Sequence, residues 1–461
     1  MPTLSKFVAG TLGHPILTTT CHETIHTWHP DCTMACVYAV PDAIRFCLRT
    51  YATFYIATNL LTKRDPRKIK WKKVLIAIIR SSIFLTMNLV FYEFWLCRIR
   101  HLLGFFTLPT LGYTNGILSS YCAILIEEPS RRPALALYLA NLASETLFNQ
   151  LVNHGYLRTI PNGTFIPFAV GLAAFKFLST KKRLHPTLQR FMSSALQEPM
   201  PVTEEDNMKK SPKQSPLAAA AERLPPTFKE LIKKLKNDCS RTEKCDHEDS
   251  CAFNALKGTT TNFSAGLALS SAVAVLRNFK KIIRSPTTLV RVLLQRENLK
   301  IPLFFGLMPL IYHMMRCSLN RAPIGLSSTV RDVASAGVSG AAMLAFPNIA
   351  ISMFTLWKAI EAIYTYLVDC GYAFYVPYGD LIIYSICTGY VLGCAAVEPH
   401  AIRKGYVSFL EGLTGNRIRM FNRTHIDFYG YESSKLYGPH HQYINPKNAT
   451  LNPFLAHPDA K

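Results

Sequence analysis

The chain has 461 residues and a formal net charge of +22. Hydrophobic residues make up 49%, the mean hydropathy is +0.13, and only 17% of the residues are charged, against roughly 25% in an average soluble domain. These values argue against a row of soluble domains. Because the basic residues form no aromatic-interleaved stripe or nucleic-acid motif, they also exclude nucleic acid as the partner.

The first segment, residues 1–43, is rich in cysteine and histidine. It lacks a clean secretory signal, because Gly-His-Pro at 13–15 interrupts its short apolar run. The stretch "CHETIHTWHPDC" brings together four residues of the types that bind zinc: Cys21, His26, His29 and Cys32. Thiolate and imidazole are ligands of structural zinc sites, but C-x4-H-x2-H-x2-C is not a standard spacing. Buried free thiols and hydrogen-bonded imidazoles remain the alternative.

Residues 44–180 form the first of two predicted membrane units. Their apolar blocks are 74–96, 104–126, 134–152 and 165–178. A helix needs about 20 mostly apolar residues to cross the hydrocarbon core, so these blocks predict a polytopic α-helical membrane protein. The stretch 43–61 precedes them and carries Arg45 and Arg49. It is expected either to cross or to lie in the membrane interface, and the number of crossings stays open.

A polar linker, residues 181–260, follows. Its first part is rich in Pro, Ser, Lys and Glu, which predicts disorder. "TFKELIKKLKN" at 227–237 is an amphipathic helix candidate, either solvated or lying on the membrane surface. The linker ends in a second cluster of ligand-type residues, C-x5-C-x-H-x3-C: Cys239, Cys245, His247 and Cys251. As for the first cluster, structural zinc and ordinary buried thiols are both open.

Residues 261–400 form the second predicted membrane unit. Their apolar blocks are 263–276, 301–315, 334–357 and 381–397. Sliding the chain by 216 residues aligns 143–163 with 359–379 without a gap, and the identical pairs include Glu, Gly, Tyr and Pro. The predicted fold is therefore all-α, with two repeated helical halves joined by the polar linker. Small residues at 112–123 and 335–345 predict close helix packing, and residues 401–461 look like a peripheral C-terminal tail.

Glu145 and Glu361 occupy equivalent apolar positions in the two halves. Ionisable groups inside a membrane are costly and usually face the bundle interior. One interpretation is a proton-linked or substrate-linked site between the repeats. The other, which we favour, is a structural polar clamp, since neither helix has a Gly or Pro break beside its Glu. Lys358 lies one turn before Glu361 and is expected to pair with it.

No catalytic motif is present: G-x-S-x-G, a P-loop and H-E-x-x-H are all missing. We therefore expect no enzyme. Basic residues gather beside the apolar blocks, which is the positive-inside pattern. The 13 cysteines are scattered, several of them inside apolar blocks, and do not form a disulfide framework.

Several stretches closely resemble the transmembrane protein 135 family, also called peroxisomal membrane protein 52. They are "CHETIHTWHPDC", "AILIEEPSRRPALALYLANLASETLF", "ENLKIPLFFG" and "PYGDLIIYSICTG". The resemblance covers about residues 20 to 430 and implies a multi-pass protein of peroxisomal and mitochondrial membranes. It implies roles in peroxisome organisation, mitochondrial fission and dynamics, and lipid homeostasis. It also implies an N-terminal cysteine-rich region, here Cys21, Cys32, Cys36 and Cys47, and no catalytic residues.

The repeat units are also distantly similar to the Tim17/Tim22/Tim23 class of membrane proteins. We expect a non-enzymatic organelle membrane protein. Its candidate partners are the lipid bilayer, the peroxisome-import or organelle-fission machinery, and a second copy of the chain. The alternative function is a small-molecule or lipid transporter that uses the interface between the two repeats.

Overall fold

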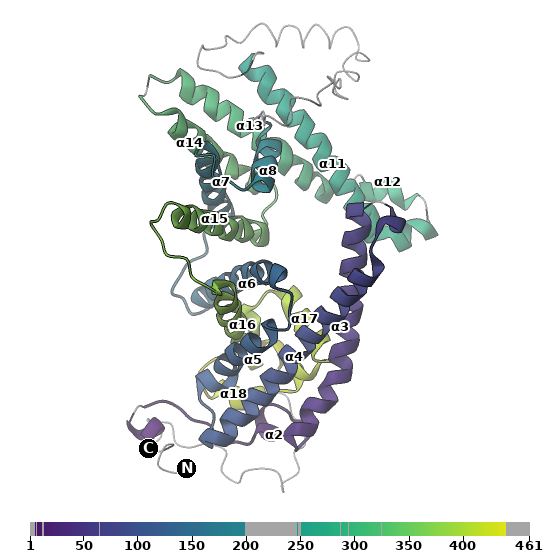
Figure 1. Cartoon of the computed structure of the whole chain (residues 1–461), viewed down its shortest axis with the longest axis vertical. Coiled ribbons are helices and arrows are strands. Elements are labelled where there is room, and N and C mark those ends of the chain that lie inside the picture. Colours follow the sequence, from purple (N-terminus) through teal and green to yellow (C-terminus); the bar gives the residue numbers. More distant parts are fainter. Residues whose placement is uncertain are drawn as a thin grey trace. The chain divides into compact units, whose positions relative to one another are not determined.

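Every regular element in the described part of the chain is a helix (Figure 1). The computed structural model describes residues 5, 7–11, 13–63, 65–198, 247, 250–285, 287–293, 295–323 and 325–438. Within these ranges the only β-type pairing is an isolated antiparallel bridge between Leu17 and Phe106. The all-α prediction is thus confirmed for the described residues. The helix expected at 227–237 lies outside them, as do Cys239 and Cys245.

The chain divides into two compact units. Unit 1 combines Met1–Arg158 with Val376–Lys461, and unit 2 is Thr159–Tyr375. These boundaries differ from the membrane units expected from the sequence, because the last helix of each expected unit packs elsewhere. Helix α7 (Phe165–Thr180) packs in unit 2, and helix α16 (Gly379–Val397) packs in unit 1.

Unit 1 is built on a hairpin of two long helices, against which the shorter helices pack. Its main helices are α3 (Cys32–Lys63), α4 (Trp71–Leu103), α5 (Thr114–Ile124), α6 (Arg132–Asn153) and α16. Helix α4 packs on α3 and α5, and α16 packs on α5 and α6. The α4 helix ends at Gly104, whose φ of 86° lies in the left-handed region and whose N–H bonds the Arg100 carbonyl at 2.8 Å. A glycine readily adopts this helix-ending conformation because it has no Cβ.

The α3 helix begins earlier than the sequence suggests. It starts at Cys32, inside the segment 1–43, and runs through Pro41. The Asp31 carboxylate accepts a hydrogen bond from the Met34 N–H at 2.9 Å, which satisfies one of the amides left over at the helix start. The end of the cysteine-rich segment therefore forms the beginning of the first long helix.

The C-terminal segment through Gly438 is part of the core of unit 1. Its helices are α17 (Lys404–Leu413), α18 (Arg423–Asp427) and α19 (Ser434–Tyr437). Val407, Leu410 and Ile418 are buried in the same cluster as residues of α4, α6 and α16. The sequence suggests a peripheral tail for 401–461, but the described part of it supplies core side chains.

Unit 2 packs helices from both sides of the polar linker. They are α7, α8 (Pro186–Leu196), α11 (Cys251–Arg284), α12 (Thr288–Leu293), α13 (Lys300–Arg321), α14 (Ser328–Ser339) and α15 (Ile349–Asp369). Helix α11 packs along α13, and α7 packs on α14 and α15. The core contains Phe168, Leu172, Phe304 and Tyr312.

Glycines bring the backbones of α5 and α16 into contact. A Cβ atom added at Gly116 would lie 2.9 Å from Gly389 Cα, and one added at Gly112 would lie 2.8 Å from Gly393 Cα. Gly116 is in α5 and Gly112 in the π-helical turn Pro109–Tyr113 just before it, so this segment and α16 each present glycines four residues apart at the crossing. In lipid there is no hydrophobic force between helices, and small residues let close backbone packing replace it.

The turns that follow α6 and α15 have the same backbone conformation. Gly155 and Gly371 both have a φ of 77°, and Asn162 and Tyr378 both have a φ of 58°. In each turn the N–H of the tyrosine after the glycine bonds the carbonyl five residues earlier, at 2.9 Å. This is a Schellman helix end, and it occurs at the positions that the 216-residue offset aligns.

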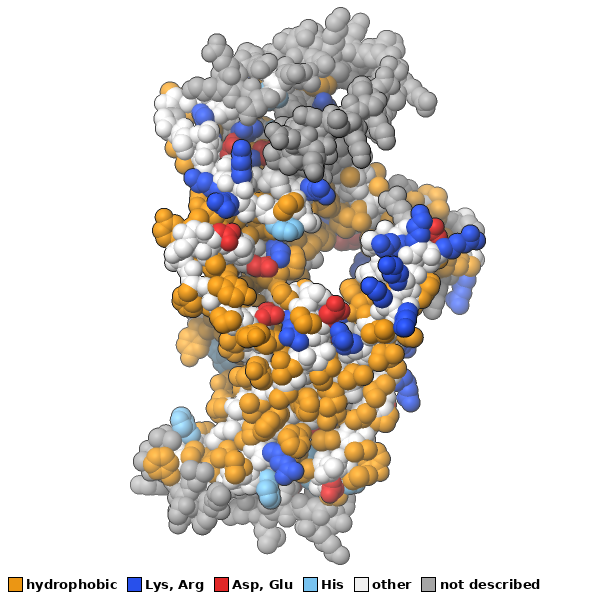
Figure 2. Space-filling model, viewed as in Figure 1, with side chains coloured by type: hydrophobic (Ala, Val, Ile, Leu, Met, Phe, Trp, Pro, Cys, Tyr) orange, Lys and Arg blue, Asp and Glu red, His pale blue; other side chains and the backbone are white. Residues whose placement is uncertain are grey.

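Two described helices, α4 and α16, are long and apolar enough to cross a membrane by length and composition, and α7 is apolar but shorter. Hydrophobic side chains gather over α4, α5 and α16 (Figure 2). The expected block 104–126 begins at Gly104, where α4 ends, and contains a π-helical turn, Pro109–Tyr113, before α5. The block 334–357 is interrupted by a 3-10 segment, Gly340–Leu344.

We expect Gly389→Ala to destabilise the protein, because the added Cβ would lie 2.5 Å from the backbone nitrogen of Ile117. Overpacking of this kind costs about 1–3 kcal/mol. Gly405→Ala, on α17, is the matched control, since its Cβ would meet nothing within 4 Å. It should be neutral or stabilising by up to about 1 kcal/mol. Thermal unfolding in detergent, followed by circular dichroism, compares them, and equal midpoints would contradict the close crossing.

Candidate metal centre

A one-turn helix, α2 (Cys21–Thr24), fixes the position of Cys21. Thr20 caps it: the Thr20 hydroxyl accepts from the Glu23 N–H at 3.3 Å, and the Glu23 carboxylate accepts from the Thr20 N–H at 2.6 Å. Such a reciprocal box satisfies two amides at the helix start. Arg100 of α4 holds the preceding residues by donating to the Thr19 carbonyl at 2.9 Å and to the Thr18 carbonyl. The cysteine therefore lies against the end of α4.

His26 follows α2 and is almost completely buried, with 1% of its surface exposed. Its Nδ1 donates to the His29 carbonyl at 2.8 Å. Its other ring nitrogen, Nε2, is buried and makes no hydrogen bond of standard geometry. A hydrogen bond at one ring nitrogen orients the ring and leaves the other nitrogen as the position for a metal, which binds there once that nitrogen has lost its proton.

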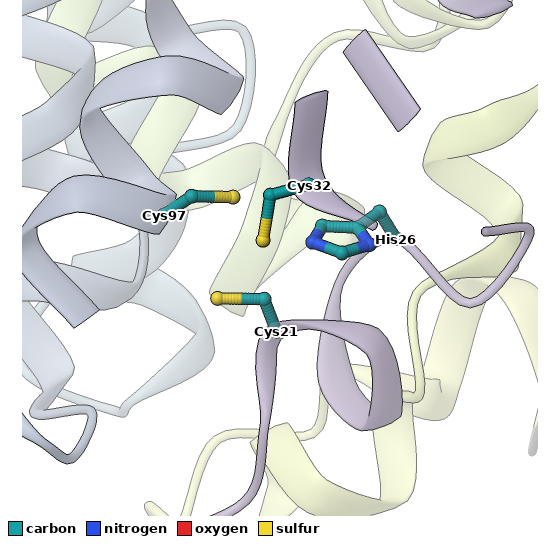
Figure 3. A group of neighbouring side chains, drawn as sticks. All are labelled: Cys21, His26, Cys32 and Cys97. Atoms are coloured by element: carbon teal, nitrogen blue, oxygen red, sulfur yellow. The ribbon is translucent and has the colours of Figure 1, made fainter. Parts of the chain in front are cut away.

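Four side chains meet at this point: Cys21, His26, Cys32 and Cys97 (Figure 3). Their sulfur and ring-nitrogen atoms all lie within 4.8 Å of one another. They come from three places, since Cys32 is the first residue of α3 and Cys97 lies in the last part of α4. The group thus joins the N-terminal segment to both helices of the hairpin.

The donor set fits zinc. Zinc binds four ligands as a tetrahedron, with Zn–S near 2.3 Å and Zn–N near 2.0–2.1 Å, which places sulfur atoms roughly 3.8 Å apart. The observed upper limit of 4.8 Å is close enough for small side-chain rotations to reach this geometry. Three thiolates with one imidazole is a known structural zinc combination, and soft sulfur ligands favour zinc over magnesium or calcium.

Charge in the group is shared between thiolate and imidazolium. Hydrogen bonds with Cys21, Cys97 and His26 lower the pKa of Cys32 far below its usual range. Burial alone would lower the pKa of His26, but the neighbouring sulfurs of Cys21 and Cys32 raise it to about 10. Thiolate is the form of cysteine that binds metals. A metal ion bound here would displace the histidine proton.

His29, the remaining ligand-type residue of the sequence-predicted set, lies outside the group. Its Nδ1 accepts from the Asp31 N–H at 3.0 Å, and its ring contacts the Tyr38 ring with 5.5 Å between centroids. Cys97 takes the fourth place instead. The sequence gives only a weak sign of this, namely a cysteine within an apolar block, because its partners are distant in the chain.

The second predicted cluster is described only in part. His247 and Cys251 lie together with Cys317 of α13, with all three ligand atoms within 4.8 Å of one another. Cys317 is not in the predicted set. The other two predicted residues, Cys239 and Cys245, are outside the described part of the chain.

Glu145 and Glu361 each pair with a cation in their own unit. Glu145 of α6 pairs with Arg403, whose Nε lies 3.1 and 3.2 Å from the two carboxylate oxygens, and its side chain is 9% exposed. Glu361 of α15 pairs with Lys358 at 2.6 Å, as the spacing predicts, and its side chain is 42% exposed. Because a basic side chain already pairs with each carboxylate, the structural clamp is favoured over a transport site.

The two pairs should respond unequally to loss of charge. Glu145→Gln leaves the Arg403 guanidinium without its buried partner, which should cost roughly 1–3 kcal/mol of unfolding free energy. Glu361→Gln removes a solvated pair, worth at most about 1 kcal/mol. Thermal unfolding in detergent measures both. A shared transport role would instead make the two variants equally defective in flux across proteoliposomes while their stabilities stay alike.

Metal analysis of the purified protein tests the composition of the group. We expect Cys97→Ser to lose about one zinc per chain, because it removes one of four ligands. His29→Ala should keep the wild-type amount, since the His29 side chain is outside the group. Cys122→Ser, on α5, controls for loss of a thiol. If His29→Ala lost the ion and Cys97→Ser kept it, the local spacing in the sequence would be the better guide.

Comparison with known families agrees with this arrangement. A family model described as the N-terminal cysteine-rich region of Transmembrane protein 135 matches residues 18–152. The matched region contains all four members of the group, from Cys21 to Cys97. No solved structure matches the chain. Residues 18–152 therefore carry the N-terminal cysteine-rich region that characterises the transmembrane protein 135 family.

Proposed function

We propose that this chain is a non-enzymatic, multi-pass protein of peroxisomal and mitochondrial membranes. Its cytosolic parts would recruit the machinery that organises peroxisomes, drives mitochondrial fission and maintains lipid homeostasis. The observation that carries the proposal is the match of residues 18–152 to the family's cysteine-rich region. That region contains one complete metal-type group and one helix long enough to span a membrane.

The membrane part of the proposal is supported by α4 and α16. Both have the length and composition of a spanning helix. Helix α4 exposes several large aliphatic side chains, among them Leu75, Ile76, Ile79 and Ile83. A row of exposed aliphatic residues on a long helix is costly in water and favourable against lipid. The basic stretch at 63–73, before and at the start of α4, fits the cytosolic side.

The group at Cys21 supports a structural role outside the membrane. A short polar segment cannot build a core of its own, and a metal ion supplies ordering energy in its place. Four protein ligands leave no open position for substrate, so the proposed centre is not catalytic. The ordered N-terminal segment also contacts the C-terminal segment, since Thr27 donates to the Met420 carbonyl and Asn422 donates to the Thr24 carbonyl, both at 2.8 Å. These bonds hold the two segments together next to the group.

The two halves would descend from one duplicated helical unit. The identical helix ends at Gly155 and Gly371 support this, as does the matching order of helices, with α5, α6 and α7 followed later by α14, α15 and α16. The likeness to the Tim17/Tim22/Tim23 class stays a prediction.

Cells that lack the protein provide the test. Fluorescent fusions of the wild type should mark peroxisomes and mitochondria, and their expression should restore the number and length of these organelles. We expect His29→Ala to restore them equally. Cys97→Ser should reach the same membranes but restore them poorly, because it removes one member of the metal group.

A fusion found mainly in the secretory pathway, with N-glycans on Asn162 or Asn448, would contradict the location. Full rescue by Cys97→Ser would show that the cellular role does not need the metal group, and it would not contradict the proposed location.

A further inference from the structure

Unit 2 contains a second meeting point of ligand-type side chains. The ligand atoms of His247, Cys251 and Cys317 lie within 4.8 Å of one another. The Cys317 Sγ is 3.5 Å from the His247 Nε2, and Cys317 is 7% exposed. Cys251 is the first residue of α11, whose start is capped by Ser250 accepting from the Phe253 N–H at 3.2 Å. The group joins two helices and the residues before them.

This group occupies the same place in its helix pair as the first group does. Cys32 opens α3 and Cys97 lies in the last part of the adjacent α4; Cys251 opens α11 and Cys317 lies in the last part of the adjacent α13. Cys251 follows Cys32 by 219 residues, and Cys317 follows Cys97 by 220. Both distances are close to the 216-residue offset of the helix ends at Gly155 and Gly371. The correspondence extends to the ligand type, since each group adds a histidine from the segment before its first helix.

We propose that His247, Cys251 and Cys317 bind a second zinc ion, the counterpart in unit 2 of the ion held by the first group. Two thiolates and an imidazole are ligands that zinc accepts, and sulfur excludes the hard cations magnesium and calcium. The Arg321 guanidinium lies 3.6 Å from the Cys251 Sγ, and a nearby positive charge stabilises a thiolate. These three are the ligands found among the described residues, and zinc takes four.

The chain would then contain two helix pairs, α3 with α4 and α11 with α13, each held together by a bound metal ion. The ion in unit 2 would hold the start of α11 against α13, as the ion in unit 1 holds the start of α3 against α4. The proposal does not rest on the organelle role, since it concerns binding by the purified chain.

Metal content per chain, measured after purification with zinc chloride and removal of unbound ions, is the test. The wild type should hold about two zinc ions. Cys317→Ser and Cys251→Ser should each hold about one, and the double variant Cys251→Ser/Cys317→Ser should also hold one, because both residues serve the same ion. Cys97→Ser combined with Cys317→Ser should hold none. Cys370→Ser, an exposed cysteine of the same unit, should hold two.

Cobalt substitution gives a second readout. Thiolate-bound cobalt has intense charge-transfer absorption that grows with the number of thiolates, so Cys317→Ser should lose about two fifths of it while its helical circular dichroism stays at the wild-type level. A Cys317→Ser variant that folds and keeps two ions would overturn the proposal. A wild type with one ion that is lost only in Cys97→Ser would overturn it as well, while leaving the first centre in place.

Discussion

Contact between the backbones of α5 and α16 is the constraint on which unit 1 depends. The glycine pairs Gly112–Gly393 and Gly116–Gly389 leave no room for a Cβ at the crossing, so only a pair of helices with glycines at this spacing can dock so closely. This docking brings a helix from late in the chain into a unit built from its first third. Residues 398–438 then continue in the same unit, where they supply core side chains. The crossing therefore determines that the C-terminal segment packs in the unit that contains the metal group.

Arg423 links the end of α16 to the segment that contacts the N-terminal residues. It is completely buried and donates hydrogen bonds to the carbonyls of Ala395 and Ala396 at the end of α16 and to the Ile418 carbonyl at 2.9 Å. A guanidinium at a helix C-terminus satisfies leftover carbonyls and complements the helix dipole. Burial lowers the pKa of Arg423 to about 10, so it remains charged at neutral pH. The segment that it anchors exchanges hydrogen bonds with residues near Cys21: the Met420 carbonyl accepts from Thr27, and the Asn422 N–H donates to the Thr24 carbonyl.

The sequence predicts the features that depend on neighbouring residues, namely the helices and some of their ends. The apolar blocks predict helices, and the 216-residue alignment finds Gly155 and Gly371, whose conformation is set by a few neighbouring residues. The fourth ligand was missed because Cys97 reaches Cys32 only when α3 and α4 pair, and the same holds for Cys317 and Cys251. His29 has ligand chemistry and lies near the other ligands in the sequence, yet its ring contacts the Tyr38 ring. The unit boundaries could not be predicted from the sequence either. Helix α7 packs in unit 2 and α16 in unit 1, and this depends on contacts between residues far apart in the chain.

The positions of both groups are explained by the conformational freedom at the open end of a long helical hairpin. Helices α3 and α4 are joined by a short connection at one end, and their other ends are free to separate. Where such a hairpin lies in lipid, as proposed for α4, little holds its two helices together beyond packing and polar contacts. A bond between Cys32 and Cys97 through a metal would close the open end, and closing a long loop removes much of the freedom of the separated state. Cys251 and Cys317 stand at the corresponding open end of α11 and α13. Ligands at the end of a hairpin, next to a short polar segment, thus give the greatest ordering for a single ion.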